Sequence, residues 1–349
     1  MRAAVFHKAG QSLTIDEVVS PEPGPTDLLI QVRSCGICGS DLHFSDVHDT
    51  SGGMTPLPPG TVMGHEFCGE VVDVGSDVSG ELKVGRAVTA LPYRGCGACQ
   101  YCLSGRGHRC RSVTYTGLGQ ETGGYAEYMR VGARESLILP DGVDWETGAL
   151  TEPLAVALHA VQLANLKAGE SVLIMGAGPI GLATALWCRF FGARHIVVSD
   201  RIDERLATAT RMGASCVVNE TKESVVGSFK KQAKRRPEVI FECVGVPGTQ
   251  QQAFDYAPTD GRIVVVGVCM SADHIVPVKA ITKELQVNYA YMYRFQDFEV
   301  TIDALNRELI DPTPMLTKTV GFEEFPTTFE SLKTDKSVCK VLLDPTKRE

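Results

Sequence analysis

Four cysteines are concentrated in one short stretch, with the spacing Cys96-x2-Cys99-x2-Cys102-x7-Cys110. Four thiolates can fill the tetrahedral coordination shell of Zn²⁺, and the glycines around these cysteines allow a loop to wrap the ion. Because no coordination position would remain for water or substrate, the pattern predicts a structural zinc site in a lobe at about residues 94–112. Unliganded thiols on such an exposed loop would instead be open to oxidation.

Metal-ligand side chains of a second kind lie in three separate segments, which carry Cys38, the pair His65 and Glu66, and Glu152. A thiolate, an imidazole and carboxylates together predict a catalytic zinc site, because such a set can keep one coordination position open. Taken singly, Cys38 is also explained as a core thiol or as half of a redox pair with Cys35. His65 is also explained as a buried core histidine, and Glu152 as an acidic residue in the first turn of a helix.

The remaining cysteines lie in apolar or strand-like surroundings without partners of metal-ligand type. They are interpreted as structural thiols: Cys35, Cys68, Cys188, Cys216, Cys243, Cys269 and Cys339.

A glycine-rich turn, Gly176-Ala177-Gly178-Pro179-Ile180-Gly181, follows an apolar strand at 171–175 and precedes a helical segment. This G-x-G-x-x-G setting predicts a dinucleotide site, with the pyrophosphate at the helix N-terminus. Asp200 ends the next strand, where a carboxylate binds the ribose 2′-hydroxyl and repels a 2′-phosphate, so NAD is favoured over NADP. Arg201 and Arg205 leave NADP open. The residues assigned to cofactor binding are Gly176, Gly178, Pro179, Ile180, Gly181, Asp200, Arg205, Val244, Gly267 and Val268.

Two kinds of element pattern must position these residues. The first 150 or so residues carry short β-type runs, such as Leu28–Val32 and Glu70–Val74, between glycines and prolines. A helix is expected at about 154–163, followed by apolar strands that alternate with helices, as in a parallel sheet. The expected strands are Ser171–Met175, His195–Ser199, Cys216–Val218, Val239–Cys243 and Arg262–Val266, and a last strand, Lys340–Leu343, returns to the first domain.

Length and composition limit the possible classes of protein. A chain of 349 residues is long enough for two cores, and its 44% hydrophobic content is that of a globular protein. The net charge of −8 argues against nucleic-acid binding, and the basic cluster at 230–236 is interpreted as the solvated end of a helix. The N-terminus lacks the apolar run of a signal peptide, and no stretch is long enough to span a membrane, so we expect a cytoplasmic protein.

These motifs resemble the zinc-dependent medium-chain dehydrogenase/reductase family, in the order that the family has them. The specific parts are Gly64-His65-Glu66-x2-Gly69-x5-Gly75-x2-Val78, the loop from Cys38 to His43, the cysteine lobe and the glycine turn. The resemblance implies an α/β protein with a GroES-like, mostly β catalytic domain at 1–153 and 290–349, a doubly wound Rossmann domain at 154–289, and an active site in the cleft. It also implies a homodimer or homotetramer.

The resemblance also implies roles for single residues. Cys38 and His65 are zinc ligands, Glu66 is a ligand or an exchanging carboxylate, and Glu152 stands where relatives have Cys, Asp or Glu, as in the polyol branch. Two expected substrate-pocket residues depart from that branch: Phe44 replaces a tyrosine, and Met292 replaces a polyol-binding arginine. The loss of these polar groups favours apolar contact with the substrate.

The expected function is oxidation of a secondary or cyclic alcohol to a ketone, with two Zn²⁺ per chain and hydride transfer to NAD. A polyol or sugar-alcohol dehydrogenase of sorbitol or butanediol type, a zinc-free reductase and a non-catalytic protein with the same fold are the alternatives. We expect Ser40 to relay the alcohol proton, with His43 as the outer relay, and Asp41 to orient His65. Ser40 is alternatively a loop-stabilising hydroxyl.

Overall fold

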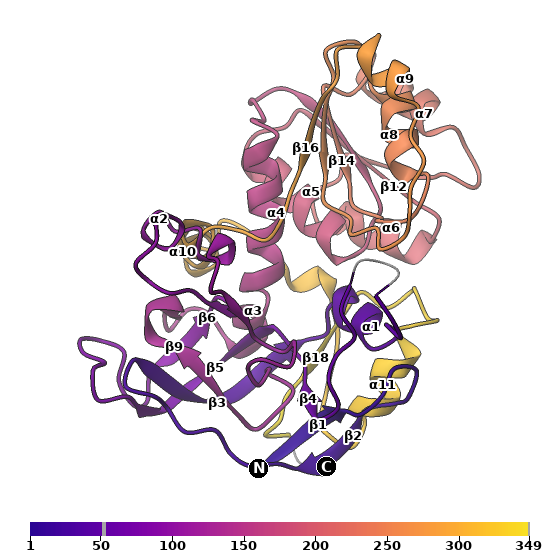
Figure 1. Cartoon of the computed structure of the whole chain (residues 1–349). Helices are drawn as coiled ribbons and strands as arrows, with labels where there is room; N and C mark the ends of the chain where they lie inside the picture. The colour runs from indigo at the N-terminus through magenta and orange to yellow at the C-terminus, as the bar shows by residue number, and fades with distance from the viewer. Residues whose placement is uncertain (51–53, 348–349) are drawn as a thin grey trace. The chain divides into compact units, whose positions relative to one another are not determined.

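The computed structural model describes residues 1–50 and 54–347, which form two compact units (Figure 1). The first unit comprises 1–152, 293–308 and 316–349, and the second comprises 153–292 and 309–315. The sequence assigned all of 290–349 to the first domain, whereas the structure groups 290–292 and 309–315 with the second unit. For 309–315 the reason is that the short 3-10 helix η3 (Thr313–Met315) packs on helix α6 (Asp203–Arg211) and buries Met315 completely.

The first unit is mostly β. Its elements are β1 (Arg2–Phe6), β2 (Thr14–Glu17), β3 (Asp27–Gly36), α1 (Gly39–Phe44), β4 (Thr61–Val62), β5 (Glu66–Val74), β6 (Ala87–Ala90), β7 (Tyr93–Arg94), α2 (Gln100–Leu103), η1 (Gly107–Arg109), β8 (Thr114–Tyr115), β9 (Tyr128–Gly132), η2 (Ala133–Glu135), β10 (Ser136–Ile138), α3 (Trp145–Ala149), α10 (Phe295–Asn306), β17 (Leu316–Val320), α11 (Phe325–Ser331) and β18 (Lys340–Leu343). Strands β2, β1 and β4 form a three-stranded sheet, and a seven-stranded sheet runs β10-β6-β5-β3-β18-β17, with β9 also paired to β3.

Strand β3 is the centre of the larger sheet, because its apolar residues alternate toward the core and Leu28, Ile30 and Val32 are fully buried. Its end is flanked by β5 and β18: Gly36 pairs with Glu66 on one side and with Leu342 on the other. This register brings segments that are distant in the sequence, including the C-terminal strand, to the point where the chain leaves β3 and enters α1. It thereby places the loop with Cys38 beside the start of β5.

The second unit is built on a six-stranded parallel sheet with the order β13-β12-β11-β14-β15-β16. Figure 1 labels β12, β14 and β16 of this sheet. Its elements are α4 (Thr151–Leu163, which begins in the first unit), β11 (Ser171–Met175), α5 (Pro179–Phe190), β12 (His195–Asp200), α6 (Asp203–Arg211), β13 (Cys216–Asn219), α7 (Val225–Ala233), β14 (Val239–Glu242), α8 (Thr249–Tyr256), β15 (Arg262–Val265), α9 (Pro277–Ile281) and β16 (Gln286–Tyr289). The strand order reverses between β11 and β14, which is the position where doubly wound sheets bind their ligands.

The predicted strands of this unit agree with the observed ones to within one residue at each end. Their continuous apolar runs reflect burial in the sheet, as in β11, where every residue is buried. Within the described part of the chain, no helix is long and apolar enough to cross a membrane.

Candidate active site and metal centres

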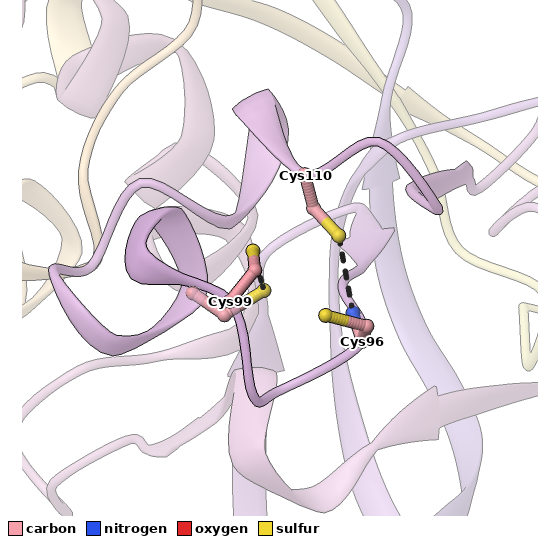
Figure 2. Close-up of side chains that lie close together, drawn as sticks. Cys96, Cys99 and Cys110 are labelled. Carbon is pink, nitrogen blue, oxygen red and sulfur yellow. Dashed lines mark hydrogen bonds between the residues drawn. The ribbon is translucent and has the colours of Figure 1, made fainter.

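The four cysteines of the lobe converge on one point. Their sulfur atoms all lie within 4.8 Å of one another, and the sulfurs of Cys99 and Cys102 are 3.6 Å apart. The four residues are Cys96, Cys99, Cys102 and Cys110. Figure 2 shows the side chains of Cys96, Cys99 and Cys110 gathered between the loops, with the Cys96 N–H donating to the Cys110 sulfur at 3.4 Å. Four soft donors in a closed set fit a tetrahedral zinc ion.

Backbone N–H groups stabilise the thiolate form of one cysteine in the lobe. The amides of Ala98 and Cys99 donate to the Cys96 sulfur and lower the pKa of Cys96 to about 6. Amides that point at a sulfur stabilise the thiolate, which is the form that binds metal. Gly97 and Gly105 have φ angles of +78° and +71°, a left-handed conformation that lets the loop reverse direction between the ligands.

A second convergence unites Cys38, His65 and Glu66, whose ligand atoms all lie within 4.8 Å of one another. Cys38 is the N-cap of α1, and Glu66 begins β5. Glycine at position 36 is required by this arrangement, because a Cβ there would lie 2.1 Å from the Glu66 carboxylate. The structure thus brings together three of the four residues predicted to bind the catalytic metal.

Asp41 holds the His65 ring. Its carboxylate lies 3.2 Å from His65 Nδ1, is 1% exposed, and also accepts hydrogen bonds from the Tyr125 hydroxyl at 2.6 Å and the Cys38 N–H at 3.2 Å. Burial by itself would lower the pKa of His65, but Asp41 and Cys38 raise it well above the ordinary value. This orientation leaves His65 Nε2 as the ring nitrogen available to a metal.

Two side chains predicted to move protons lie on the same short helix. The Ser40 hydroxyl is 3.5 Å from His65 Nε2, the outer limit of a hydrogen bond, and His43 lies at the surface. Desolvation and the charge of Lys336 lower the pKa of His43. The imidazole is therefore neutral near pH 7 and able to accept a proton.

Sequence reasoning did not find Lys340, which is 1% exposed and donates to both Glu66 carboxylate oxygens, at 2.7 and 2.6 Å. Its third acceptor is the carbonyl of Ile37, at 3.0 Å. The available signal was a single lysine at the head of an otherwise apolar final strand. A buried carboxylate is held here by a buried cation, which offsets part of the cost of desolvating both.

Glu152 lies outside the three-residue cluster. Its side chain is in the first turn of α4 and is 8% exposed. Burial raises the pKa of Glu152 to about 7; the charge of Glu66 adds to this shift, and the charge of His65 opposes it. The buried hydroxyl of Tyr293 faces it, although no hydrogen bond of normal geometry joins the two groups.

Neither expected substrate-pocket residue belongs to the metal-ligand cluster. Phe44, at the end of α1, is partly buried against the hydrophobic core of the first unit. Met292 ends a segment of the second unit with a φ angle of +54°. A role for either residue in substrate binding stays a prediction.

The glycine turn of the second unit has room for a pyrophosphate. A Cβ on Gly181 would lie 1.9 Å from the Gly176 carbonyl oxygen, so a glycine is required there for close packing of α5. At Gly178, the N-cap of α5, the nearest atom to such a Cβ is an Arg205 nitrogen at 4.0 Å. This open approach to a helix N-terminus suits an anionic ligand.

Asp200 organises the neighbouring loop. Its carboxylate accepts hydrogen bonds from the Ala177 N–H at 2.7 Å and from the Arg201 and Ile202 N–H groups at 2.7 and 3.0 Å. The Arg201 side chain is turned to Glu220, at 2.7 Å. The carboxylate is therefore fixed to the glycine turn by backbone donors, and Arg201 is held by a separate acid.

Glu242 is a second organising residue that the sequence did not reveal. It is 1% exposed, and its carboxylate accepts from the N–H groups of Val244 and Gly245 at 2.8 and 3.0 Å. A Cβ on Gly267 would lie 2.3 Å from Gly245 N, so the loops after β14 and β15 are closely packed. These loops carry Val244, Gly267 and Val268, the other residues assigned to the cofactor.

Comparison with known proteins agrees with this architecture. Residues 24–141 match the family model described as alcohol dehydrogenase GroES-like domain, and residues 179–307 match the one described as zinc-binding dehydrogenase. An L-threonine 3-dehydrogenase of Aeromonas salmonicida is 34% identical over 338 residues, which cover 97% of each chain.

Solved structures are similar over nearly the whole chain. A putative zinc-binding dehydrogenase from Sinorhizobium meliloti, bound to NADP, has 32% identity and a TM-score of 0.89, with 99% of each chain covered. The 2R,3R-butanediol dehydrogenase from Bacillus subtilis has 31% identity and a TM-score of 0.88, also with 99% of each chain covered.

The fold, the two clusters of metal-ligand side chains and these matches define a zinc-binding oxidoreductase with a GroES-like and a Rossmann unit. The chain belongs to the zinc-dependent medium-chain dehydrogenase/reductase family.

Proposed function

We propose that this protein is an NAD-linked dehydrogenase that oxidises a secondary or cyclic alcohol to a ketone. The observation that supports this most is the convergence of Cys38, His65 and Glu66 beside the Ser40 hydroxyl. L-Threonine and 2R,3R-butanediol, named for two similar proteins, are both secondary alcohols. A polyol or sugar-alcohol substrate is the second candidate, favoured by the carboxylate at position 152.

The donor sets fit two zinc ions of different kinds, one held by four thiolates and one by Cys38, His65 and Glu66. When bound, the second ion supplies Lewis acidity toward the alcohol oxygen, and the nicotinamide accepts the hydride. Glu152 is then the carboxylate available for exchange beside the metal.

The chain's own residues provide a route for the alcohol proton. Ser40 is beside the histidine ligand, and its hydroxyl can accept a proton while it donates its own. His43, three residues further along α1, lies at the surface and is neutral near pH 7. We therefore assign Ser40 as the inner group and His43 as the outer group of the relay.

The preference for NAD rests on Asp200, because its fixed carboxylate would repel a 2′-phosphate. Arg205 is assigned to the adenosine ribose, and its guanidinium already lies near Gly178. The similar Sinorhizobium protein is bound to NADP, so the two cofactors must be compared directly.

We further propose that the protein is a homodimer or homotetramer. Strand β16 is an edge of the parallel sheet, and Tyr289 on it is 63% exposed; Val278 and Ile281 on the neighbouring helix α9 are 56% and 70% exposed. An open edge bordered by apolar side chains is suited to pairing with a second copy. A light-scattering mass equal to one chain would contradict this assignment.

The function is tested by a dehydrogenation screen of apolar, cyclic and polyhydroxy alcohols, with NAD and NADP in parallel. We expect NADH formation with at least one secondary alcohol and its loss in Cys38→Ser. Cys269→Ser, which replaces a thiol of the second unit, is the matched control and should retain activity. Enone reduction without zinc would support the zinc-free reductase, and inactivity on all alcohols with both zincs bound would support a non-catalytic protein.

A further inference from the structure

Tyr293 has a buried hydroxyl that the proposed reaction leaves without a role. The residue is 0% exposed, and its hydroxyl has no hydrogen-bond partner of normal geometry. Leaving a buried O–H unpaired costs about 1–3 kcal/mol. Burial raises the pKa of Tyr293, and the Glu152 carboxylate raises it further, so the two groups lie in the same buried region.

The ring of Tyr293 is fixed from one side by Phe298 on α10, with ring centroids 4.9 Å apart. Helix α10 begins two residues after Tyr293, so the start of this helix determines where the tyrosine hydroxyl lies. The segment that carries this hydroxyl thus leads directly into the first turn of α10.

That first turn is attached to the four-cysteine lobe. The N–H of Phe295 donates to the carbonyl of Gly105 at 2.9 Å, and a Cβ on Gly105 would lie 2.5 Å from the side chain of Gln296. A cavity of about 240 Å³ lies along this contact, and Cys102 is among the residues that line it. The lobe therefore touches α10 through one hydrogen bond and one close contact, beside one of its metal ligands.

We propose that Tyr293 is a positioning residue for Glu152, and that the four-cysteine lobe holds Tyr293 in place by docking on the first turn of α10. The inference rests on the proposed function, because Glu152 acts beside the catalytic metal only there. It gives the lobe a second task besides stabilising the fold: the lobe controls the orientation of a carboxylate at the other metal centre.

The first experiment is a double-mutant cycle of Tyr293→Phe and Glu152→Ala. Each protein is assayed for kcat and KM with the best alcohol of the screen, and for the rate at which the labile zinc passes to a chelator. We expect Tyr293→Phe to lower kcat or speed zinc loss by about 10-fold, with KM nearly unchanged, and to have no further effect in Glu152→Ala.

Tyr93→Phe is the control, because it removes the hydroxyl of another buried tyrosine, whose pKa is raised by burial and then by Glu135. Its effects should add to those of Glu152→Ala. Independent, additive effects of Tyr293→Phe and Glu152→Ala would overturn the inference, and so would wild-type kcat and zinc loss in Tyr293→Phe. An inactive wild type would instead refute the proposed function, and the zinc-loss cycle would still decide the role of Tyr293.

The second experiment tests the lobe with two matched alanines. Gly105→Ala and Gly97→Ala both place a side chain at a positive φ angle in the lobe, but only Gly105 faces α10. Both variants should bind two zinc ions, and only Gly105→Ala should reproduce the loss seen in Tyr293→Phe, without adding to it. Equal effects of the two alanines would show that the lobe acts through general strain and would overturn this part of the proposal.

Discussion

Two carboxylates beside one set of metal-ligand side chains have opposite electrostatic surroundings. Glu66 is paired with Lys340 inside the protein, and both are 1% exposed. Among the described residues, Glu152 forms no ion pair, and its pKa is raised to about 7 by burial first of all. Two carboxylates with such different surroundings can have different roles: Glu66 is held in place as a ligand, and Glu152 is free to exchange or titrate.

At the residue scale, Ser40 is the most direct test of the proton relay. Ser40→Ala should lower kcat by about 10²-fold or more, because the inner proton acceptor is lost, while zinc content and cofactor affinity stay near normal. Ser45→Ala is a control close by, since that hydroxyl donates to the Leu42 carbonyl at 2.8 Å. Wild-type turnover in Ser40→Ala would show that another group, such as water, carries the proton.

Cofactor choice also depends on a single side chain. Asp200→Ser should shift the ratio of kcat/KM for NAD over NADP toward NADP by roughly 10-fold or more, because a fixed negative charge near the 2′-phosphate is removed. Asp203→Ser removes an acid three residues on that pairs with Lys222, and should leave the ratio unchanged. A wild type that prefers NADP would refute the assignment and direct attention to Arg201.

Single residues with a motif around them were predictable, and residues defined by long-range contacts were not. Cys38, His65 and Glu66 stand in sequence patterns whose spacing indicates their chemistry. Lys340 contacts Glu66, which is 274 residues away in the sequence. The position of Tyr293 depends on the path of a loop, and no local sequence pattern specifies that path. The roles proposed for these side chains depend on their burial, and no sequence pattern indicates that a single lysine or tyrosine is buried.

At the scale of elements, the register of β3 with β5 and β18 assembles the proposed catalytic centre. The apolar pattern was sufficient to predict five of the six strands of the second unit, because strands covered on both faces are continuously apolar. The edge strand β16 is largely exposed and was not among them. Short elements of the first unit, such as β4 and β7 with two residues each, carry too few residues for any pattern. Their positions follow from tertiary contacts.

An ion pair ties two elements of the second unit together. The Arg262 guanidinium, at the start of β15, donates to the carbonyls of Ala164 and Asn165 at 2.8 Å each and to the carboxylate of Glu170. Burial opposes ionisation of Glu170, but Arg262 and the Lys167 N–H lower its pKa below the ordinary value of 4.5. This pair therefore stabilises the folded state at neutral pH.

Because the pKa of Glu170 is lower in the folded protein than in the unfolded chain, its contribution is complete above about pH 5 and is lost as the pH falls through the folded value. Glu170→Gln should cost about 1 kcal/mol near neutrality, and the difference from wild type should shrink in acid. Asp303→Asn, in an exposed pair with Arg307, should cost less at every pH. If the free energies of unfolding of wild type and Glu170→Gln differed by the same amount from about pH 3 to about pH 7, the ion pair would not be the cause.

At the scale of the whole molecule, the second unit is inserted in the sequence between segments of the first unit. The sequence changes from short β runs to alternating strands and helices, and this change indicates two units. Short β runs are typical of a mostly antiparallel sheet, and alternating strands and helices are typical of a parallel one. The short excursion at 309–315 was not predicted, since it depends on Met315 packing into the second unit and not on any periodicity. The four cysteines of the lobe, in contrast, follow a local spacing, and the structure brings their sulfur atoms together; a zinc ion at this site stays a prediction.

If two zinc ions with different tasks bind to the first unit, as we propose, metal content and activity should fall in two separate steps. A chelator should first remove one zinc per chain and abolish alcohol oxidation, while the unfolding temperature changes little. Added Zn²⁺ should restore activity. Removal of the second zinc should then lower the unfolding temperature, because the four-cysteine lobe loses its core. Full activity in a protein that holds a single zinc, or none, would contradict the account.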